Sequence, residues 1–177
     1  MERNNTKKLA MAGIMIALSQ ILSYVKVYNM PQGGSVTAGS MVPIILFSLI
    51  YGLKDGLFAA LVYGLLQFIL GGGVAIHPLS ILLDYLLGFG VLGLAGVFHT
   101  KTKNLPKALI GGLFASVMRY LMVFIAGVVV WGSYAPDTMP VWQYSLTYNG
   151  SYMVPEIILT LVVIALVYGK FYDNVKR

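Results

Sequence analysis

Long apolar runs dominate this chain, and short polar or Gly/Pro-rich stretches separate them. A helix that crosses a bilayer needs about 20 predominantly apolar residues, with about 17–25 usual. The pattern predicts six membrane-spanning helices, at 7–27, 39–53, 56–71, 78–98, 106–130 and 151–172. The second and third fall slightly short of the usual length, so we expect them to be tilted or sheltered by neighbouring helices.

Composition agrees with a membrane protein. Of the 177 residues, 58% are hydrophobic and 10% are charged, whereas a soluble domain carries about 25% charged residues. The chain therefore reads as an all-α integral membrane protein with a single domain over residues 1–177. No small-residue cleavage site follows the first apolar run, so we interpret that run as a retained helix. The absence of cysteine from the sequence excludes a disulfide framework and a thiolate metal site.

The basic residues orient the six predicted helices. Only Lys26 falls on one side of the membrane, whereas ten basic residues fall on the other: Arg3, Lys7, Lys8, Lys54, Lys101, Lys103, Lys107, Lys170, Lys176 and Arg177. The positive-inside rule then places both the N- and the C-terminus in the cytoplasm. Because this bias accounts for the net charge of +6, we expect the lipid bilayer, and no nucleic acid, as the partner of the basic residues.

Three connections then face outward, at 28–38, 72–77 and 131–150. They contain "MPQGGSVTAGS", "GGGVAIHP" and most of "WGSYAPDTMPVWQYSLTYNGSYMVPE". These segments are rich in glycine, aromatic and hydroxyl side chains, whereas the inner connections are short and basic. The asymmetry predicts a binding cavity open to the outside.

Three ionisable side chains fall inside predicted spans, namely Asp84, Arg119 and Glu156. A charge at mid-bilayer costs about 2.5–3.5 kcal/mol on insertion scales, so such residues usually pair or bind something. A salt bridge of Arg119 with Glu156 or Asp84, or a Glu156 wetted at the interface, would satisfy them. For Asp84 we favour a ligand role, because a carboxylate followed by the ring of Tyr85 suits an organic cation.

Aromatic residues crowd the last outer connection and the helix that follows it. They are Trp131, Tyr134, Trp142, Tyr144, Tyr148 and Tyr152. Membrane interfaces are rich in Trp and Tyr whatever the function, so we assign at least half of these rings to an interface belt. The others would bury a flat heteroaromatic ligand. Asn149 would offer such a ring, for example an aminopyrimidine, both a donor and an acceptor.

Catalytic and metal-binding motifs are missing from the sequence. It has no P-loop, nucleophile elbow or paired carboxylates, and His77, before Pro78, is read as a helix cap. We therefore expect no enzyme activity, metal or cofactor. Two alternatives stay open, a membrane enzyme that uses Asp84, His77 or Glu156 and a stand-alone secondary transporter. The lack of an evident internal repeat disfavours the second.

Four motifs point to a family. "MPQGGSV", "HPLSILLDY", "RYLMVFIAG" and the 131–156 segment together resemble the thiamine-specific substrate-binding (S) components of energy-coupling factor (ECF) transporters, the ThiT/YuaJ family. The resemblance runs from the first helix to the last. It implies a six-helix protein of the prokaryotic plasma membrane that captures thiamine at the outer face. A transmembrane coupling protein and two cytoplasmic ATPases are then the implied partners.

The resemblance also implies roles for individual residues. Asp84 matches the carboxylate that faces the thiazolium ring, with Tyr85 beside it. Trp131 matches the tryptophan that stacks on the ligand. Tyr144 and Asn149 match the residues that contact the pyrimidine.

Several other positions match the family pattern, and one position differs from it. Gly127 matches the glycine that precedes the tryptophan, and Gly13 with Ala17 matches the small-residue motif that docks on the coupling protein. Taken without the resemblance, this pair would read as internal helix packing. Val123 stands where the family has a histidine, and losing a ligand hydrogen bond costs about 0.5–1.5 kcal/mol. We therefore expect lower affinity, or a thiamine precursor or analogue as ligand. Arg119 occupies a basic position of the family, which indicates a structural role.

Overall fold

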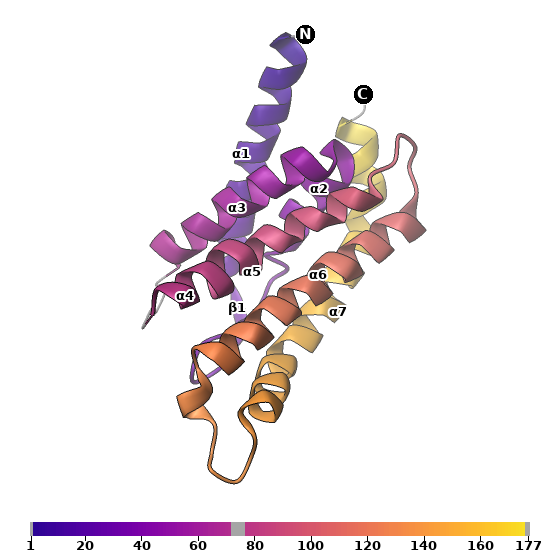
Figure 1. The fold of residues 1–177 in the computed structure, drawn as a ribbon. Helices are drawn as coiled ribbons and strands as arrows, with labels where there is room; N and C mark the ends of the chain where they lie inside the picture. The colour runs from indigo at the N-terminus through magenta and orange to yellow at the C-terminus, as the bar shows by residue number, and fades with distance from the viewer. Residues whose placement is uncertain (1, 72–76, 176–177) are drawn as a thin grey trace.

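The computed structural model describes residues 2–71 and 77–175, which form helices and one short hairpin (Figure 1). The first part contains α1 (Glu2–Tyr24), β1 (Lys26–Asn29), β2 (Ser35–Thr37), α2 (Val42–Tyr51) and α3 (Leu53–Leu70). The second part contains α4 (Pro78–Ser80), η1 (Ile81–Leu87), α5 (Gly88–Gly90), η2 (Val91–Phe98), α6 (Leu105–Val129), η3 (Gly132–Tyr134) and α7 (Val141–Val175). Most of the predicted outer segment 72–77 lies outside the described residues.

The described ranges contain six longer helical segments, besides the three-residue η3, when α4, η1, α5 and η2 are taken as one continuous helix. The predicted six-helix membrane protein is confirmed. Four segments are long and apolar enough to cross a membrane: α3, the 78–98 segment, α6 and α7. The ten-residue α2 is buried at nine positions, so neighbouring helices shelter it as predicted. Both termini lie at one end of the bundle (Figure 1), as an even number of spans requires.

The 78–98 helix has the predicted bounds but an irregular interior. Its η1 turn is a π-helix and its η2 end is a 3-10 helix. The tight end packs directly on α3, because a Cβ atom at Gly93 would collide with the backbone of Leu57. Single π turns inside helices occur frequently at functional sites, and this one carries Asp84.

The predicted start of the last helix is wrong by ten residues. The prediction placed it at residue 151 because of the polar and aromatic composition before it, whereas α7 begins at Val141 and continues through Pro155. Tyr144, Tyr148 and Tyr152 are spaced by four residues and therefore share one face of α7. The first helix also differs from its predicted range 7–27, because it extends from Glu2 to Tyr24.

The first outer connection forms an antiparallel β1–β2 hairpin that the all-α prediction missed. Its strands pair Tyr28 with Val36 and Asn29 with Ser35. The turn uses positive φ angles of 94° at Gly33 and 88° at Gly34, a backbone conformation that glycine adopts readily and other residues rarely. The two adjacent glycines thus allow the chain to reverse between the two strands.

Candidate ligand-binding cavity

A cavity of about 470 Å³ lies among the hairpin, α3, the 78–98 helix, α6 and α7. Small-molecule sites usually measure about 300–1,000 Å³. The structure brings all seven predicted ligand-contacting residues to its lining: Asp84, Tyr85, Val123, Gly127, Trp131, Tyr144 and Asn149. Residues from three helical segments and from the connection after α6 therefore converge on one space, and their roles toward a ligand stay predictions.

Asp84 and Trp131 are in direct contact at the cavity wall. The indole Nε1–H donates a hydrogen bond of 2.8 Å to Asp84 Oδ2, which joins the π turn of the 78–98 helix to the end of α6. Among the described residues, no Lys or Arg nitrogen lies within 4 Å of an Asp84 oxygen. A hydrogen bond from a neutral indole does not neutralise the charge of a carboxylate inside a membrane span, so a bound cation would stabilise Asp84.

Arg119 lies deeper along α6 and also lines the cavity. Its guanidinium carbon sits 3.5 Å from the centroid of the Phe89 ring, close enough for a cation–π contact. Neither Asp84 nor Glu156 approaches within 4 Å of its nitrogens, so the salt-bridge alternative is wrong for these described residues. The buried Nη1 atom has no hydrogen-bond partner in the described part of the chain, and sequence reasoning gave Arg119 too little weight as a cavity residue.

Glu156 holds the hairpin to α7. Its two carboxylate oxygens accept hydrogen bonds of 2.6 Å from the backbone N–H and the hydroxyl of Thr37. Ser40 lies within 2.8 Å of that hydroxyl. Glu156 is 3% exposed, so it is not wetted at the interface, and it forms no ion pair within 4 Å among the described residues. This contact joins residues 119 positions apart, and neither residue carried a sequence signal for it.

The tyrosine face of α7 holds the tip of the hairpin. The Tyr148 hydroxyl accepts the N–H of Gln32 at 2.9 Å and donates to the carbonyl of Gly33 at 2.9 Å. The Tyr144 hydroxyl donates to Gln32 Oε1. The rings of Tyr144 and Tyr148 stack with centroids 5.6 Å apart. The motif "MPQGGSV" therefore supplies the cover of the cavity, and Gln32 is a lining residue that the sequence reasoning missed.

Comparison with known proteins identifies the family. The family model described as Thiamine transporter protein (Thia_YuaJ) matches residues 9–175. The chain belongs to this family. A curated relative from Bacillus subtilis (strain 168), named thiamine transporter ThiT, is 39% identical over 173 residues, or 91% of this chain and 90% of its own. A second ThiT, from Lacticaseibacillus paracasei, is 33% identical over 168 residues, with 85% and 81% covered.

The fold agrees with a solved structure of ThiT from Listeria monocytogenes. The TM-score is 0.85 over 97% of this chain and 98% of the other, at 22% identity. The resemblance indicated by the four motifs is thus confirmed for the thiamine transporter family, and the chain is a multi-pass protein of the cell membrane. The family and its relatives are described by transport rather than catalysis, so the membrane-enzyme alternative is set aside.

Asn149 of this family member is already hydrogen-bonded within α7. Its Nδ2 donates to the Ser145 carbonyl at 2.9 Å, and its Oδ1 accepts the Tyr152 hydroxyl at 2.7 Å. A Cβ atom at Gly127 would collide with the Ser145 hydroxyl and lie 3.0 Å from Asn149 Nδ2. Gly127 therefore allows α6 to approach α7 closely beside the amide. Val123 is 6% exposed and packs in an apolar cluster with Tyr152.

The aromatic residues divide into two groups. Trp142 is 56% exposed and does not line the cavity, which suits an interface belt. The other five all line the cavity: Trp131, Tyr134, Tyr144, Tyr148 and Tyr152. His77 caps the 78–98 helix, where its Nδ1 accepts the N–H of Leu79 at 3.1 Å, as the sequence predicted.

The small residues of α1 face away from the bundle. Gly13 and Ala17 are both exposed, and Gly13 has no atom within 4 Å of where a Cβ would stand. Internal packing therefore does not explain the pair. It leaves on α1 a smooth surface that another helix can approach closely.

Proposed function

We propose that this protein is the substrate-binding component of an ECF-type transporter and captures thiamine from the outer face. The observation that carries the proposal is the contact between Asp84 and Trp131 at the wall of the cavity. The carboxylate offers negative charge to the thiazolium, and the indole face offers quadrupole attraction of about 0.5–2 kcal/mol. One wall thus suits both the charge and the flatness of the ligand.

A second group of lining residues, on α7, suits the pyrimidine end of thiamine. Tyr144 and Asn149 both line the cavity. The Asn149 Nδ2 donates to the carbonyl and the hydroxyl of Ser145, whereas its Oδ1 accepts one hydrogen bond from Tyr152 and can accept a second from an exocyclic amine. Ser145 and Tyr152 fix the orientation of the Asn149 amide through hydrogen bonds. A preoriented amide loses little side-chain freedom when a ligand binds, which favours affinity.

Val123 limits the affinity in this proposal. Its side chain contributes an apolar contact and no hydrogen bond, so a nearby ligand group must find a partner elsewhere. Because a missing hydrogen bond costs about 0.5–1.5 kcal/mol, thiamine precursors or analogues that lack the matching group would bind nearly as well as thiamine. Competition between thiamine and such compounds measures this preference.

A titration of the purified protein with thiamine tests capture of the vitamin. The sequence has two tryptophans, and they separate cleanly: Trp131 lines the cavity whereas Trp142 is exposed outside it. In Trp142→Phe, all indole fluorescence comes from Trp131, and saturable quenching by thiamine should persist. In Trp131→Phe, the remaining indole should not respond. No saturable quenching of the Trp142→Phe variant at micromolar thiamine would contradict the proposal.

Two features support the ECF assignment: a sequence without a nucleotide-binding motif and an exposed pair of small residues on α1. The sequence contains no nucleotide-binding motif. In this proposal, ATP hydrolysis is supplied by two cytoplasmic ATPases through a transmembrane coupling protein. The exposed pair Gly13 and Ala17 is the proposed docking surface for that coupling protein. Gly13→Leu should abolish ATP-driven thiamine uptake in reconstituted vesicles while thiamine binding stays unchanged. Uptake driven by an ion gradient without partner subunits would instead indicate a secondary transporter.

A further inference from the structure

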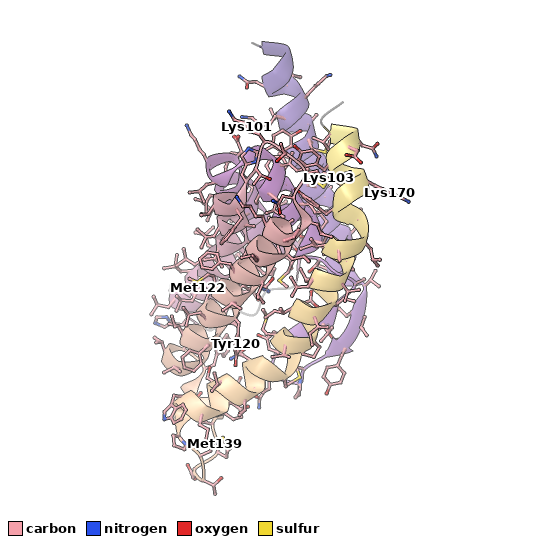
Figure 2. The ribbon with its side chains drawn as sticks, turned by 90° about the vertical axis from the view of Figure 1, so that its right-hand side faces the viewer. Lys101, Lys103, Tyr120, Met122, Met139 and Lys170 are labelled. Carbon is pink, nitrogen blue, oxygen red and sulfur yellow. The ribbon has the colours of Figure 1, made fainter. Side chains whose placement is uncertain are left out.

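A second concave surface lies at the opposite end of the molecule, between the start of α6 and the end of α7. It is a groove of about 510 Å³. We call it the basic groove and define it by six of its lining residues: Lys103, Leu105, Leu166, Gly169, Lys170 and Asp173. Figure 2 shows Lys101, Lys103 and Lys170 at the end of the molecule where α7 finishes. This is the end assigned to the cytoplasm.

The walls and the rim of the basic groove differ in polarity. Leu166 is 73% exposed and Leu105 is 37% exposed, so the walls present apolar surface to the bilayer. Lys170 lies one helical turn beyond Leu166, about 6 Å further along the axis of α7. This places a cation where lipid headgroups begin and apolar surface where the acyl chains begin.

The lysines of the rim are not equivalent. Lys103 forms an ion pair with Asp173 at 2.7 Å, so those two charges compensate each other. Lys170 is exposed and has no acidic oxygen within 4 Å among the described residues. The groove therefore keeps one uncompensated positive charge, which matches a ligand group with one negative charge.

Tyrosine hydroxyls of α7 hold this rim in place. The Tyr172 hydroxyl donates to the carbonyl of Lys101 at 2.6 Å, and the Tyr168 hydroxyl accepts the N–H of Asn104 at 3.4 Å. The connection that carries Lys103 is thereby fixed against α7. A fixed rim keeps the groove open without any occupant.

Gly169 supplies an independent observation. Glycine inside a helix costs roughly 0.5–1 kcal/mol relative to alanine, and here no atom lies within 4 Å of where its Cβ would stand. Internal packing therefore gives no reason for the missing side chain. Space left beside the backbone at the floor of the groove lets something from outside the chain lie against α7.

From these features we propose that the basic groove binds one anionic phospholipid of the cytoplasmic leaflet. Its phosphate would meet Lys170, and the first part of one acyl chain would lie along Gly169 between the two leucines. Basic pockets between membrane helices on this side of a bilayer suit anionic headgroups. A protein helix would fill the apolar walls equally well, but it would not account for the single uncompensated charge at headgroup level.

Native mass spectrometry of the purified full chain with added phosphatidylglycerol or phosphatidylcholine tests the proposal. The wild-type protein should retain one phosphatidylglycerol and discriminate against phosphatidylcholine. Lys170→Gln should lower the phosphatidylglycerol affinity about fivefold, since one surface cation contributes about that factor. Gly169→Leu, which adds an apolar side chain where a Cβ meets no atom within 4 Å, should lower it at least as much.

Lys54→Gln is the matched control, because Lys54 is exposed on the same side but lies outside the groove. It should bind phosphatidylglycerol as the wild type does, and thermal unfolding checks that every variant stays folded. Equal binding by all four proteins, or equal retention of both lipids, would overturn the proposal. So would variants that keep the lipid but no longer associate with the coupling subunit, since the occupant would then be a protein helix.

Discussion

Replacing Asp84 with asparagine isolates the charge of the proposed thiamine site. The amide keeps an oxygen in place of the one that accepts the Trp131 indole N–H at 2.8 Å, so the wall should keep its shape. What disappears is the negative charge. At about 4 Å and an effective dielectric constant of about 20, a charge pair is worth about 4 kcal/mol.

Part of that energy is offset in the wild-type protein, because a carboxylate inside the membrane lacks the hydration it has in water. We therefore expect a net loss of about 2–3 kcal/mol in thiamine binding, or about 30- to 150-fold in Kd. The fluorescence titration measures this change directly. Asp137→Asn is the matched control, because Asp137 is exposed on the same outer face and lies outside the cavity lining.

A neutral analogue of thiamine, in which an uncharged ring replaces the thiazolium, completes a double-mutant cycle. The wild-type protein should prefer thiamine to the analogue, whereas Asp84→Asn should bind both with similar affinity. An equal loss of affinity for both ligands would mean that Asp84 only shapes the wall. Unchanged thiamine affinity in Asp84→Asn would refute the charge argument altogether.

Three further predictions use substitutions at the cavity. Gly34→Ala should lower the thermal stability more than Gly33→Ala: both incur the left-handed backbone cost of about 1–2 kcal/mol, but only the first drives a Cβ into a tyrosine ring of α7. Gly127→Ala should weaken thiamine binding about tenfold or more, because overpacking costs about 1–3 kcal/mol. Adding Ser145→Ala to this variant should restore part of the affinity, because it removes the hydroxyl with which the new Cβ collides. Val123→His should raise thiamine affinity by about two- to tenfold, as expected for one added hydrogen bond; a titration that shows weaker binding would mean that the buried site lacks room for the ring.

The sequence predicted the helices whose boundaries are marked by local signals. The 78–98 helix begins at Pro78 and ends at Phe98 as predicted, because a proline after a capping histidine fixes its start. The start of α7 was missed because composition was weighed above periodicity. The spacing of Tyr144, Tyr148 and Tyr152 by four residues was a readable helical signal in that stretch.

Contacts between distant parts of the chain were beyond the reach of the sequence. The hairpin depends on Thr37 meeting Glu156, and its tip depends on Gln32 meeting two tyrosines of α7. No local sequence propensity predicts these hydrogen bonds, because their partners come together only after the helices have packed. The ligand-contacting residues implied by the family resemblance did converge on one cavity, whereas Arg119, Thr37 and Gln32 were recognised as lining residues only in three dimensions.

The charges around the cavity favour one kind of ligand. In their ordinary ionised forms, Asp84 and Glu156 contribute two negative charges and Arg119 one positive charge, which leaves a net charge of −1. Lys26 also lines the cavity but is exposed on the hairpin, where water screens it. The three charged groups take neutral partners rather than one another: Asp84 an indole, Glu156 a threonine and Arg119 a phenyl ring. A ligand with a single positive charge would balance this site inside the membrane, whereas a neutral or anionic ligand would leave its charge uncompensated.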